Sequence, residues 1–183
     1  NDTVDFSTTL AKTLSGQLQP VAPQHFVIRD VKEPPPSQLR CAHTVTMYDG
    51  GMYMFGGRTA QTALGNYVGG IHVFVPARSS WVEVPAKGHQ PLKRGDHSAV
   101  VYKDQLIVFG GRKHTLFYDD MHAFDFTTGR WSTIVFETRC GPGHIFGHSA
   151  VVHKDRMYVV GGVHRDQTDH LIHAFDLKYN YWV

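Results

Sequence analysis

The stretch Leu-Ile-Val-Phe-Gly-Gly at residues 106–111 decides how the rest of the chain is interpreted, because a close copy lies on each side of it. Upstream, residues 52–57 read Met-Tyr-Met-Phe-Gly-Gly, and downstream, residues 157–162 read Met-Tyr-Val-Val-Gly-Gly. Each copy is a short apolar run that ends in two glycines. A segment that returns at a period of roughly 20–50 residues is typical of solenoids and propellers.

Histidines and tryptophans recur at nearly constant distances from these copies. The second glycine of each pair lies 14 residues after a histidine (His43, His97 and His148). Each pair is followed by one of the 3 tryptophans of the chain, which are about 50 residues apart (Trp81, Trp131 and Trp182). Another histidine lies 9 residues before each tryptophan (His72, His122 and His173). These markers define three repeats in phase.

Within each repeat the pattern predicts four strands separated by polar turns. We expect the first strand at residues 43–48, 97–102 and 148–153, and the second is the apolar run that ends in the glycine pair. The third is expected at residues 71–74, 121–124 and 172–175, and the fourth carries the tryptophan. In two repeats an aspartate follows the third strand (Asp125 and Asp176), where its carboxylate can accept backbone N–H groups of the next turn. The first repeat has Val75-Pro76 there, so its turn must be built differently.

A small four-stranded sheet cannot bury both of its faces alone. Stacking such sheets face to face around an axis buries them and leaves only short edges. In this arrangement the paired glycines let a neighbouring aromatic ring or backbone approach closely. The tryptophan of the fourth strand is expected to fill the space between sheets.

The chain resembles the kelch family of β-propellers over roughly residues 26–183. The resemblance rests on Arg40-x-x-His43, on Arg94-x-x-His97, on the three glycine pairs, on the Phe-Asp of the third strand and on the spaced tryptophans. The fold class it implies is all-β: a kelch-type β-propeller with three four-stranded blades. The third repeat departs from the pattern, because Ile145 replaces the first arginine and Val163 replaces the arginine found at Arg58 and Arg112.

We expect an N-terminal arm or linker at residues 1–24 and a propeller segment at residues 25–183, with blades at about 40–86, 94–137 and 145–183. Residues 26–28 are interpreted as one extra strand, the last of a preceding repeat. Propellers generally have about four blades or more. We therefore expect an incomplete ring, closed by further repeats of the same protein beyond Val183 or by other chains.

Composition narrows the function classes. The net charge of +2 and the absence of a lysine or arginine run predict no nucleic-acid binding. The apolar runs are too short to cross a membrane. Two cysteines, Cys41 and Cys140, fall in loops two repeats apart, where a disulfide between them is not expected. Unpaired thiols slightly favour an intracellular compartment.

The kelch resemblance implies that the loops after the second strands and the linkers between blades share one face, which commonly binds partners. We therefore predict a non-enzymatic protein–protein interaction module or scaffold subunit. Arginines grouped on one face can hold carboxylates or phosphates with paired hydrogen bonds. Alternatively, Arg40 and Arg94 pair with loop acids such as Asp96 or Asp119, or simply face water. The candidate partner-binding residues are Arg40, Arg58, Arg94, Arg112, His114, Phe117, Tyr118, His144, His164 and Arg165.

Sequence signatures of catalysis are missing: the chain has no Gly-x-Ser-x-Gly and no phosphate-binding glycine loop. We predict no catalytic residue, no metal and no cofactor. The recurring histidines are interpreted as structural, with ring nitrogens bonded to nearby backbone. The alternative is a propeller enzyme or small-ligand binder with a metal site lined by histidines, built from His144 and His148 with His114, His164 or His170.

Overall fold

The computed structural model describes residues 40–59, 65–137, 140–164 and 167–183. In this part of the chain the secondary structure consists of β-strands and one 3₁₀ turn, η1 (Pro76–Arg78). None of its helices is long and apolar enough to cross a membrane. The all-β, kelch-type prediction is confirmed, and the described residues form no closed ring. The predicted arm at residues 1–24 and the extra strand at residues 26–28 lie outside the described residues.

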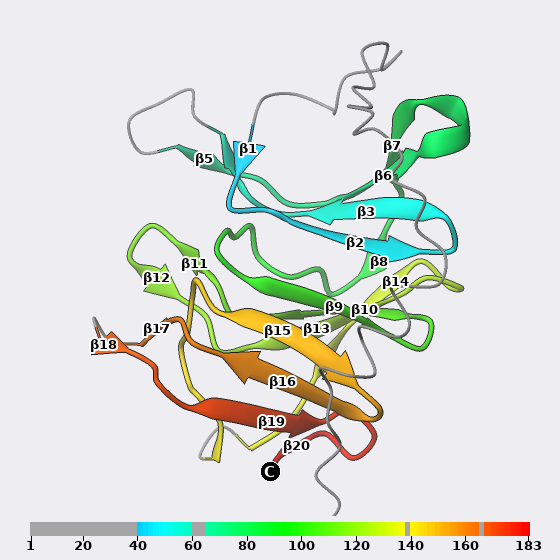
Figure 1. Ribbon diagram of the computed structural model, residues 1–183. Helices are drawn as coiled ribbons and strands as arrows, with labels where there is room; N and C mark the ends of the chain where they lie inside the picture. The colour runs from blue at the N-terminus through cyan, green and yellow to red at the C-terminus, as the bar shows by residue number, and fades with distance from the viewer. Residues whose placement is uncertain (1–39, 60–64, 138–139, 165–166) are drawn as a thin grey trace, which may run out of the picture. The chain divides into compact units, whose positions relative to one another are not determined.

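Three antiparallel sheets follow one another along the chain and are here named blades A, B and C (Figure 1). Blade A consists of β2 (Thr44–Tyr48), β3 (Gly51–Phe55), β6 (Ile71–Val75) and β7 (Ser80–Val84). Blade B consists of β9 (Ser98–Tyr102), β10 (Gln105–Phe109), β13 (Met121–Asp125) and β14 (Arg130–Ile134). Blade C consists of β15 (Ser149–His153), β16 (Arg156–Val160), β19 (Ile172–Asp176) and β20 (Tyr181–Trp182).

Blade B has a fifth strand that the sequence pattern did not predict. The linker that leaves blade A forms β8 (Lys87–Gly88), which pairs in parallel with β14. Gly88 lies opposite Trp131 in this register and has a φ of +84°. A linker that contributes a strand to the next blade ties the two blades together through backbone hydrogen bonds.

The turns after the third strands follow the sequence expectation. The Asp125 carboxylate accepts a hydrogen bond from the Thr128 backbone N–H at 2.7 Å, and Asp176 accepts one from Tyr179 at 2.9 Å. Blade A, which lacks this aspartate, uses the 3₁₀ turn η1 instead, and the turn ends in Ser79 with a left-handed φ of 49°.

Two apolar cores lie between the blades. One joins blades A and B around Phe55, Leu106, Val108 and Trp131. The other joins blades B and C around Phe109, Met121, Met157 and Trp182. Trp131 and Trp182 are both buried, so the prediction that tryptophan fills the space between blades is confirmed.

The glycine pairs allow the backbone of the next blade to approach. A Cβ atom on Gly56 would lie 2.7 Å from the Arg94 carbonyl oxygen, and one on Gly110 would lie 2.6 Å from that of Ile145. Both glycines also have positive φ, +66° and +63°. A side chain at either position would therefore collide with the neighbouring blade as well as strain the backbone.

The histidines before the first strands connect the blades. His97 Nε2 is hydrogen-bonded to Thr44 Oγ1 of blade A at 2.8 Å, and His148 Nε2 is hydrogen-bonded to Ser98 Oγ of blade B at 2.8 Å. These histidines have the structural role that the repeat predicted. The predicted backbone partner is wrong at these two nitrogens, because each is bonded to a side-chain hydroxyl of the preceding blade.

Candidate interaction face

Short hairpins extend from the same end of each blade (Figure 1). They are β4 (Arg58–Thr59) with β5 (Asn66–Tyr67), β11 (Arg112–Lys113) with β12 (Leu116–Phe117), and β17 (Val163–His164) with β18 (Gln167–Thr168). The linker before each first strand pairs with the hairpin of its own blade: β1 (Arg40–Cys41) pairs with β4, Gly95 with Arg112 and Phe146 with Val163. These hairpins and linkers together form what we call the loop face.

Arg94 lies beneath the loop face and exposes none of its surface. Its guanidinium donates to both carboxylate oxygens of Asp120, at 2.5 and 2.9 Å, and to the carbonyl oxygens of Gly110 and Leu92. The ring of Tyr118, itself buried, lies 4.1 Å from the guanidinium carbon. Buried in this way, neither Arg94 nor Tyr118 can touch a partner, and we leave both out of the proposed contact set.

Asp120 is the carboxylate that holds this cluster together. It accepts a further hydrogen bond from His122 Nε2 at 2.8 Å. Burial opposes the negative charge, but hydrogen bonds from Arg94 and His122 hold the pKa of the Asp120 carboxyl well below its usual range. The alternative that Arg94 pairs with a loop acid is therefore the observed one, although its partner is Asp120 rather than Asp96 or Asp119.

Arg112 lies at the surface in a rigid stack. Its Nε donates to the Asp96 carboxylate at 2.7 Å, and its guanidinium lies 4.4 Å from the centre of the Phe146 ring. Phe117 stacks on Phe146, with ring centres 5.2 Å apart and planes 10° apart. Within the described residues the terminal nitrogens Nη1 and Nη2 donate no hydrogen bond. A third of the Arg112 side chain, 32%, is exposed.

Two histidine candidates come from the blade B hairpin and from the linker before blade C. His114 is exposed and lies edge-on against the ring of Tyr67, 5.0 Å away. His144 is half exposed, with its Nδ1 3.5 Å from the Asp119 carboxylate. Leu116, which the sequence reasoning did not select, exposes 53% of its surface. The adjacent apolar residues Leu116 and Phe117, in a loop between two predicted strands, were the signal in the sequence that could have identified this surface.

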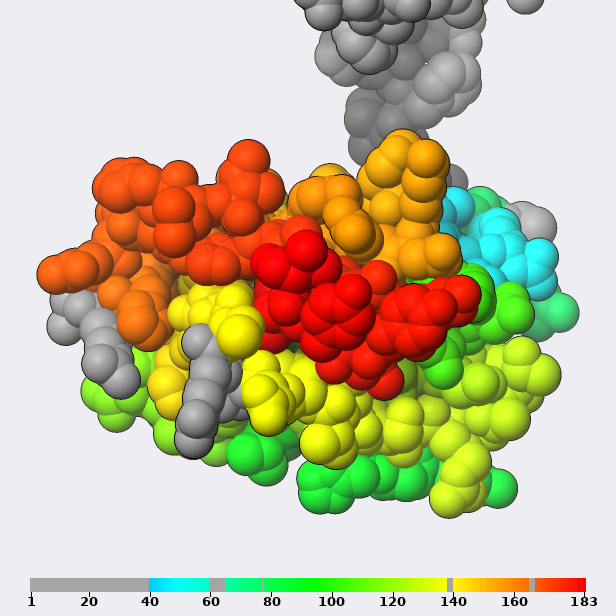
Figure 2. Space-filling view, turned by 90° about the horizontal axis from the view of Figure 1, so that it is seen from below, coloured from blue at the N-terminus to red at the C-terminus, as the bar shows by residue number. Residues whose placement is uncertain are grey.

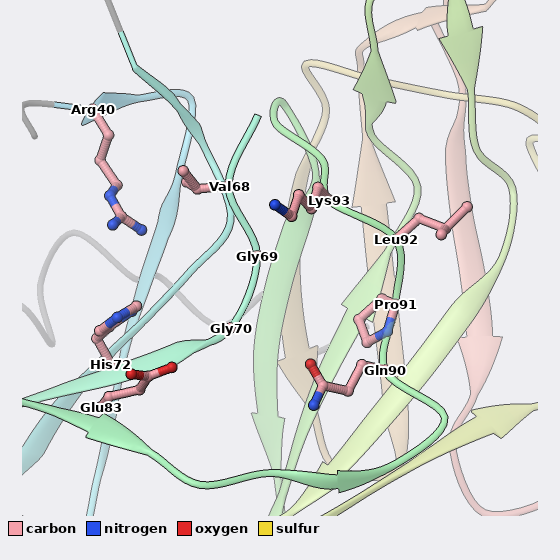
Figure 3. Close-up of a pocket in the computed structure, with 10 residues that line it drawn as sticks. All are labelled: Arg40, Val68, Gly69, Gly70, His72, Glu83, Gln90, Pro91, Leu92 and Lys93. Carbon is pink, nitrogen blue, oxygen red and sulfur yellow. The ribbon is translucent and has the colours of Figure 1, made fainter. Parts of the chain in front are cut away.

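Arg40 lies beside a pocket of about 470 Å³ at the edge of blade A (Figure 3). Its Nη1 donates to the Gly56 carbonyl oxygen at 3.3 Å. The pocket is lined by Arg40, Val68, Gly69, Gly70, His72, Glu83, Gln90, Pro91, Leu92 and Lys93. In Figure 3, Arg40 comes from β1, His72 and Glu83 come from blade A, and Gln90 to Lys93 come from the linker that faces them. The resemblance placed the linkers on the candidate face, but the candidate residues chosen from the sequence do not include Gln90 to Lys93.

The remaining candidates are dispersed. Arg58 is half-buried in β4, and Arg165 lies outside the described residues. His164 lines a second pocket of about 420 Å³ together with Asp169, His170 and His173. Asp169 accepts a hydrogen bond from His173 Nε2 at 2.7 Å. Among the residues that the structure describes, histidine, cysteine, aspartate and glutamate side chains do not gather in a group of three or more that could hold a metal ion.

Comparison with known proteins agrees with the kelch-type fold. A family model described as the KLHDC2/KLHL20/DRC7 Kelch-repeats domain matches residues 42–183. This chain belongs to the kelch-repeat family.

Among similar kelch-repeat relatives is Acyl-CoA-binding domain-containing protein 5 of Arabidopsis thaliana, which is 32% identical over 139 residues, 74% of this chain and 20% of that protein. Leucine-zipper-like transcriptional regulator 1 of Homo sapiens is 28% identical over 78% of this chain and 18% of its own length. Kelch domain-containing protein 3 of Bos taurus is 32% identical over 61% of this chain and 32% of its own length. The chain thus spans a third or less of these proteins.

Proposed function

We propose that this kelch-repeat chain is a non-enzymatic interaction module or scaffold subunit that recognises another protein through its loop face. Kelch-repeat domains typically mediate protein–protein interactions. The observation that carries the proposal here is the stack of Arg112, Phe146 and Phe117. Arginine and aromatic residues are enriched where interfaces bind most strongly, particularly when their positions are fixed in advance.

The stack presents chemistry suited to an acidic, partly apolar segment. Arg112 is fixed through Nε, so its two terminal nitrogens can meet a carboxylate without a large loss of side-chain freedom. The exposed Leu116 and the half-buried Phe117 supply apolar surface beside it. His114 of the blade B hairpin and His144 of the linker before blade C extend the candidate contact set. Arg40, Arg58, His164 and Arg165 complete it as more peripheral members.

Charge reversal tests the proposal. Arg112→Glu is compared with Arg130→Glu, which reverses an exposed arginine at the start of β14, at the opposite end of blade B from the hairpin. Both variants and the parent chain are immobilised and incubated with the same protein mixture. The proteins that each chain retains are then quantified by mass spectrometry. We expect a protein retained by the parent and by Arg130→Glu to be lost, by at least tenfold, from Arg112→Glu, while circular dichroism shows both variants folded. Equal retention by all three would overturn the placement of the binding surface.

The second candidate function is small-ligand binding in the pocket lined by His164, His170 and His173. The observation that favours it is the convergence of three histidines with Asp169 on a pocket of about 420 Å³. Because the described side chains form no group that could hold a metal ion, this candidate concerns a ligand bound without a metal. Native mass spectrometry of the purified chain that shows no bound small molecule would remove it.

A further inference from the structure

The histidine at the second position of the third strand is bonded to a carboxylate in blades B and C. His122 Nε2 is hydrogen-bonded to Asp120 at 2.8 Å, and His173 Nε2 is hydrogen-bonded to Asp169 at 2.7 Å. Both aspartates lie in the loop that leads into the third strand of their blade. In blade C this strand, β19, lies with β20 at the front of Figure 2, in red. The same pairing thus occurs in two of the three blades.

Blade A has the histidine but no aspartate before it. His72 is the second residue of β6, and the two residues before this strand are Gly69 and Gly70. His72 is more than nine-tenths buried, with 7% of its surface exposed. Its Nδ1 is buried without a partner, as is that of His122. Unlike that of His122, its Nε2 also makes no hydrogen bond to the residues that the structure describes. Buried polar atoms are nearly always hydrogen-bonded, so this ring calls for a partner.

The pocket of about 470 Å³ lies where such a partner would bind (Figure 3). A Cβ atom on Gly70 would meet only the Cε1 atom of the His72 ring, at 3.9 Å, so the space beside the ring is open. In Figure 3, Arg40 and His72 lie on one side of this space, and Gln90 and Lys93 lie on the other. The volume is within the range of about 300–1,000 Å³ that is usual for small-molecule sites.

The charges around the pocket favour an anion. Arg40 and Lys93 are basic residues of its lining, and Glu83, which lies opposite His72 in the sheet, is an acidic one. Burial lowers the pKa of His72, and the positive charge of Arg40 lowers it further, while Glu83 opposes the change. The ring is therefore neutral at pH 7 and can donate one N–H to an acceptor. Arg40 acts on the ring electrostatically, so both groups can act on the same ligand.

We propose that this pocket binds a small carboxylic acid, whose carboxylate occupies the place beside His72 that Asp120 occupies beside His122. Arg40 and Lys93 supply the attracting charge. Apolar surface for a short hydrocarbon body comes from Val68, Pro91 and Leu92. The residues of the Arg112 stack do not line this pocket, so the site is separate from the proposed protein-binding surface. Failure of either proposal would leave the other standing.

Phenylacetate and its neutral analogue phenylacetamide test the site on the full chain. We expect phenylacetate to shift the assigned imidazole NMR signals of His72 and to saturate with a dissociation constant of about 1 mM. The amide has nearly the same shape but no charge, and it should bind about tenfold more weakly or less. Bound phenylacetate should also raise the pKa of His72, because a nearby negative charge favours the imidazolium.

Charge variants show whether the ligand lies in the pocket. Lys93→Met should weaken phenylacetate binding about threefold, and Glu83→Gln, which removes the opposing charge, should strengthen it by a similar factor. Lys113→Met is the matched control, because Lys113 is an exposed lysine of β11 outside the pocket, and its replacement should leave the affinity unchanged. Thermal melts within a few degrees of the parent would show that the variants remain folded.

Three results would overturn the proposal. One is the lack of a saturable shift of the His72 signals with phenylacetate up to about 10 mM. Another is equal affinity for the acid and the amide, or for the acid in the parent and in Lys93→Met. The third is binding of a short glutamate peptide with blocked ends but not of phenylacetate, which would assign the pocket to an acidic side chain of a protein.

Discussion

The buried guanidinium of Arg94 depends on a single carboxylate. Asp120 accepts two hydrogen bonds from it and a third from His122, while Gly110 and Leu92 contribute only carbonyl oxygens. A fully buried cation without a counter-charge is strongly unfavourable, because it has lost its hydration. The stability of blade B at this point therefore rests on Asp120 much more than on other acids of the same loop.

Replacing Asp120 tests this dependence. We expect Asp120→Asn to lower the free energy of unfolding by about 3 kcal/mol, since it leaves the charge of Arg94 buried without a carboxylate. Asp119→Asn is the matched control. Asp119 is the adjacent residue and lies 3.5 Å from an exposed histidine, and its replacement should cost less than about 0.5 kcal/mol. Urea denaturation followed by tryptophan fluorescence measures both. Equal losses would mean that the Arg94 pair contributes no more than a surface contact.

At the scale of the element, the turn that ends each second strand is built for the neighbouring blade. Gly110 and Gly161 have nearly the same backbone conformation, with φ of +63° and +65°. They differ in what surrounds them, because Gly110 lies against the Ile145 carbonyl and the His148 ring. This pair separates the cost of backbone strain from the cost of a collision between blades.

Alanine at each glycine measures the two costs. Gly161→Ala should cost about 1 kcal/mol of unfolding free energy, from the left-handed backbone alone. Gly110→Ala should cost about 3 kcal/mol or more, because the added methyl group also pushes blade C away from blade B. Losses of unfolding free energy that agree within 0.5 kcal/mol would contradict this expectation. They would show that the added methyl group at Gly110 is accommodated beside Ile145 without disturbing the interface between blades B and C.

Much of the element pattern was predictable from the sequence, and the limits have a physical origin. The glycine pairs, tryptophans and turn aspartates each act within one repeat or at a fixed offset, so three copies of the pattern reveal their role. Arg94 was not predictable in the same way, because its partner Asp120 lies across a loop whose length differs between repeats. The parallel strand β8 follows from the path of a linker between blades. The short hairpins form in the loops between the second and third strands. The repeat period predicts neither.

At the scale of the whole molecule, two buried histidines connect the three blades. Burial, together with the charges of Arg94 and neighbouring histidines, lowers the pKa of His97 to about 3. Burial also lowers the pKa of His148 to about 4. Both side chains are therefore neutral at pH 7, and each is hydrogen-bonded to a hydroxyl of the preceding blade.

These pKa values predict that acid weakens both interfaces. In the unfolded chain a histidine takes up a proton near pH 6.5, whereas in the folded chain these two remain neutral until about pH 4 and pH 3. Stability should thus be highest above pH 6.5 and fall as the pH decreases below it. At pH 5 each histidine should account for a loss of about 2 kcal/mol. Unfolding free energies of the parent and of His148→Gln between pH 8 and pH 5 measure this, and the variant should lose about half as much. Identical pH profiles would contradict the assignment to His148.

The polar contacts between successive blades also bear on how chains of this kind can change in length. Blade B receives a hydroxyl contact and a glycine N–H from blade A and offers the same groups to blade C, so its two sides are complementary to each other. Duplicating or deleting one whole repeat therefore rejoins matching sides and requires no new interface. An insertion or deletion whose length is not a whole number of repeats would separate the histidine from its hydroxyl and leave both buried without a partner. Changes of about 50 residues, the spacing of the tryptophans, would thus preserve the interfaces between blades.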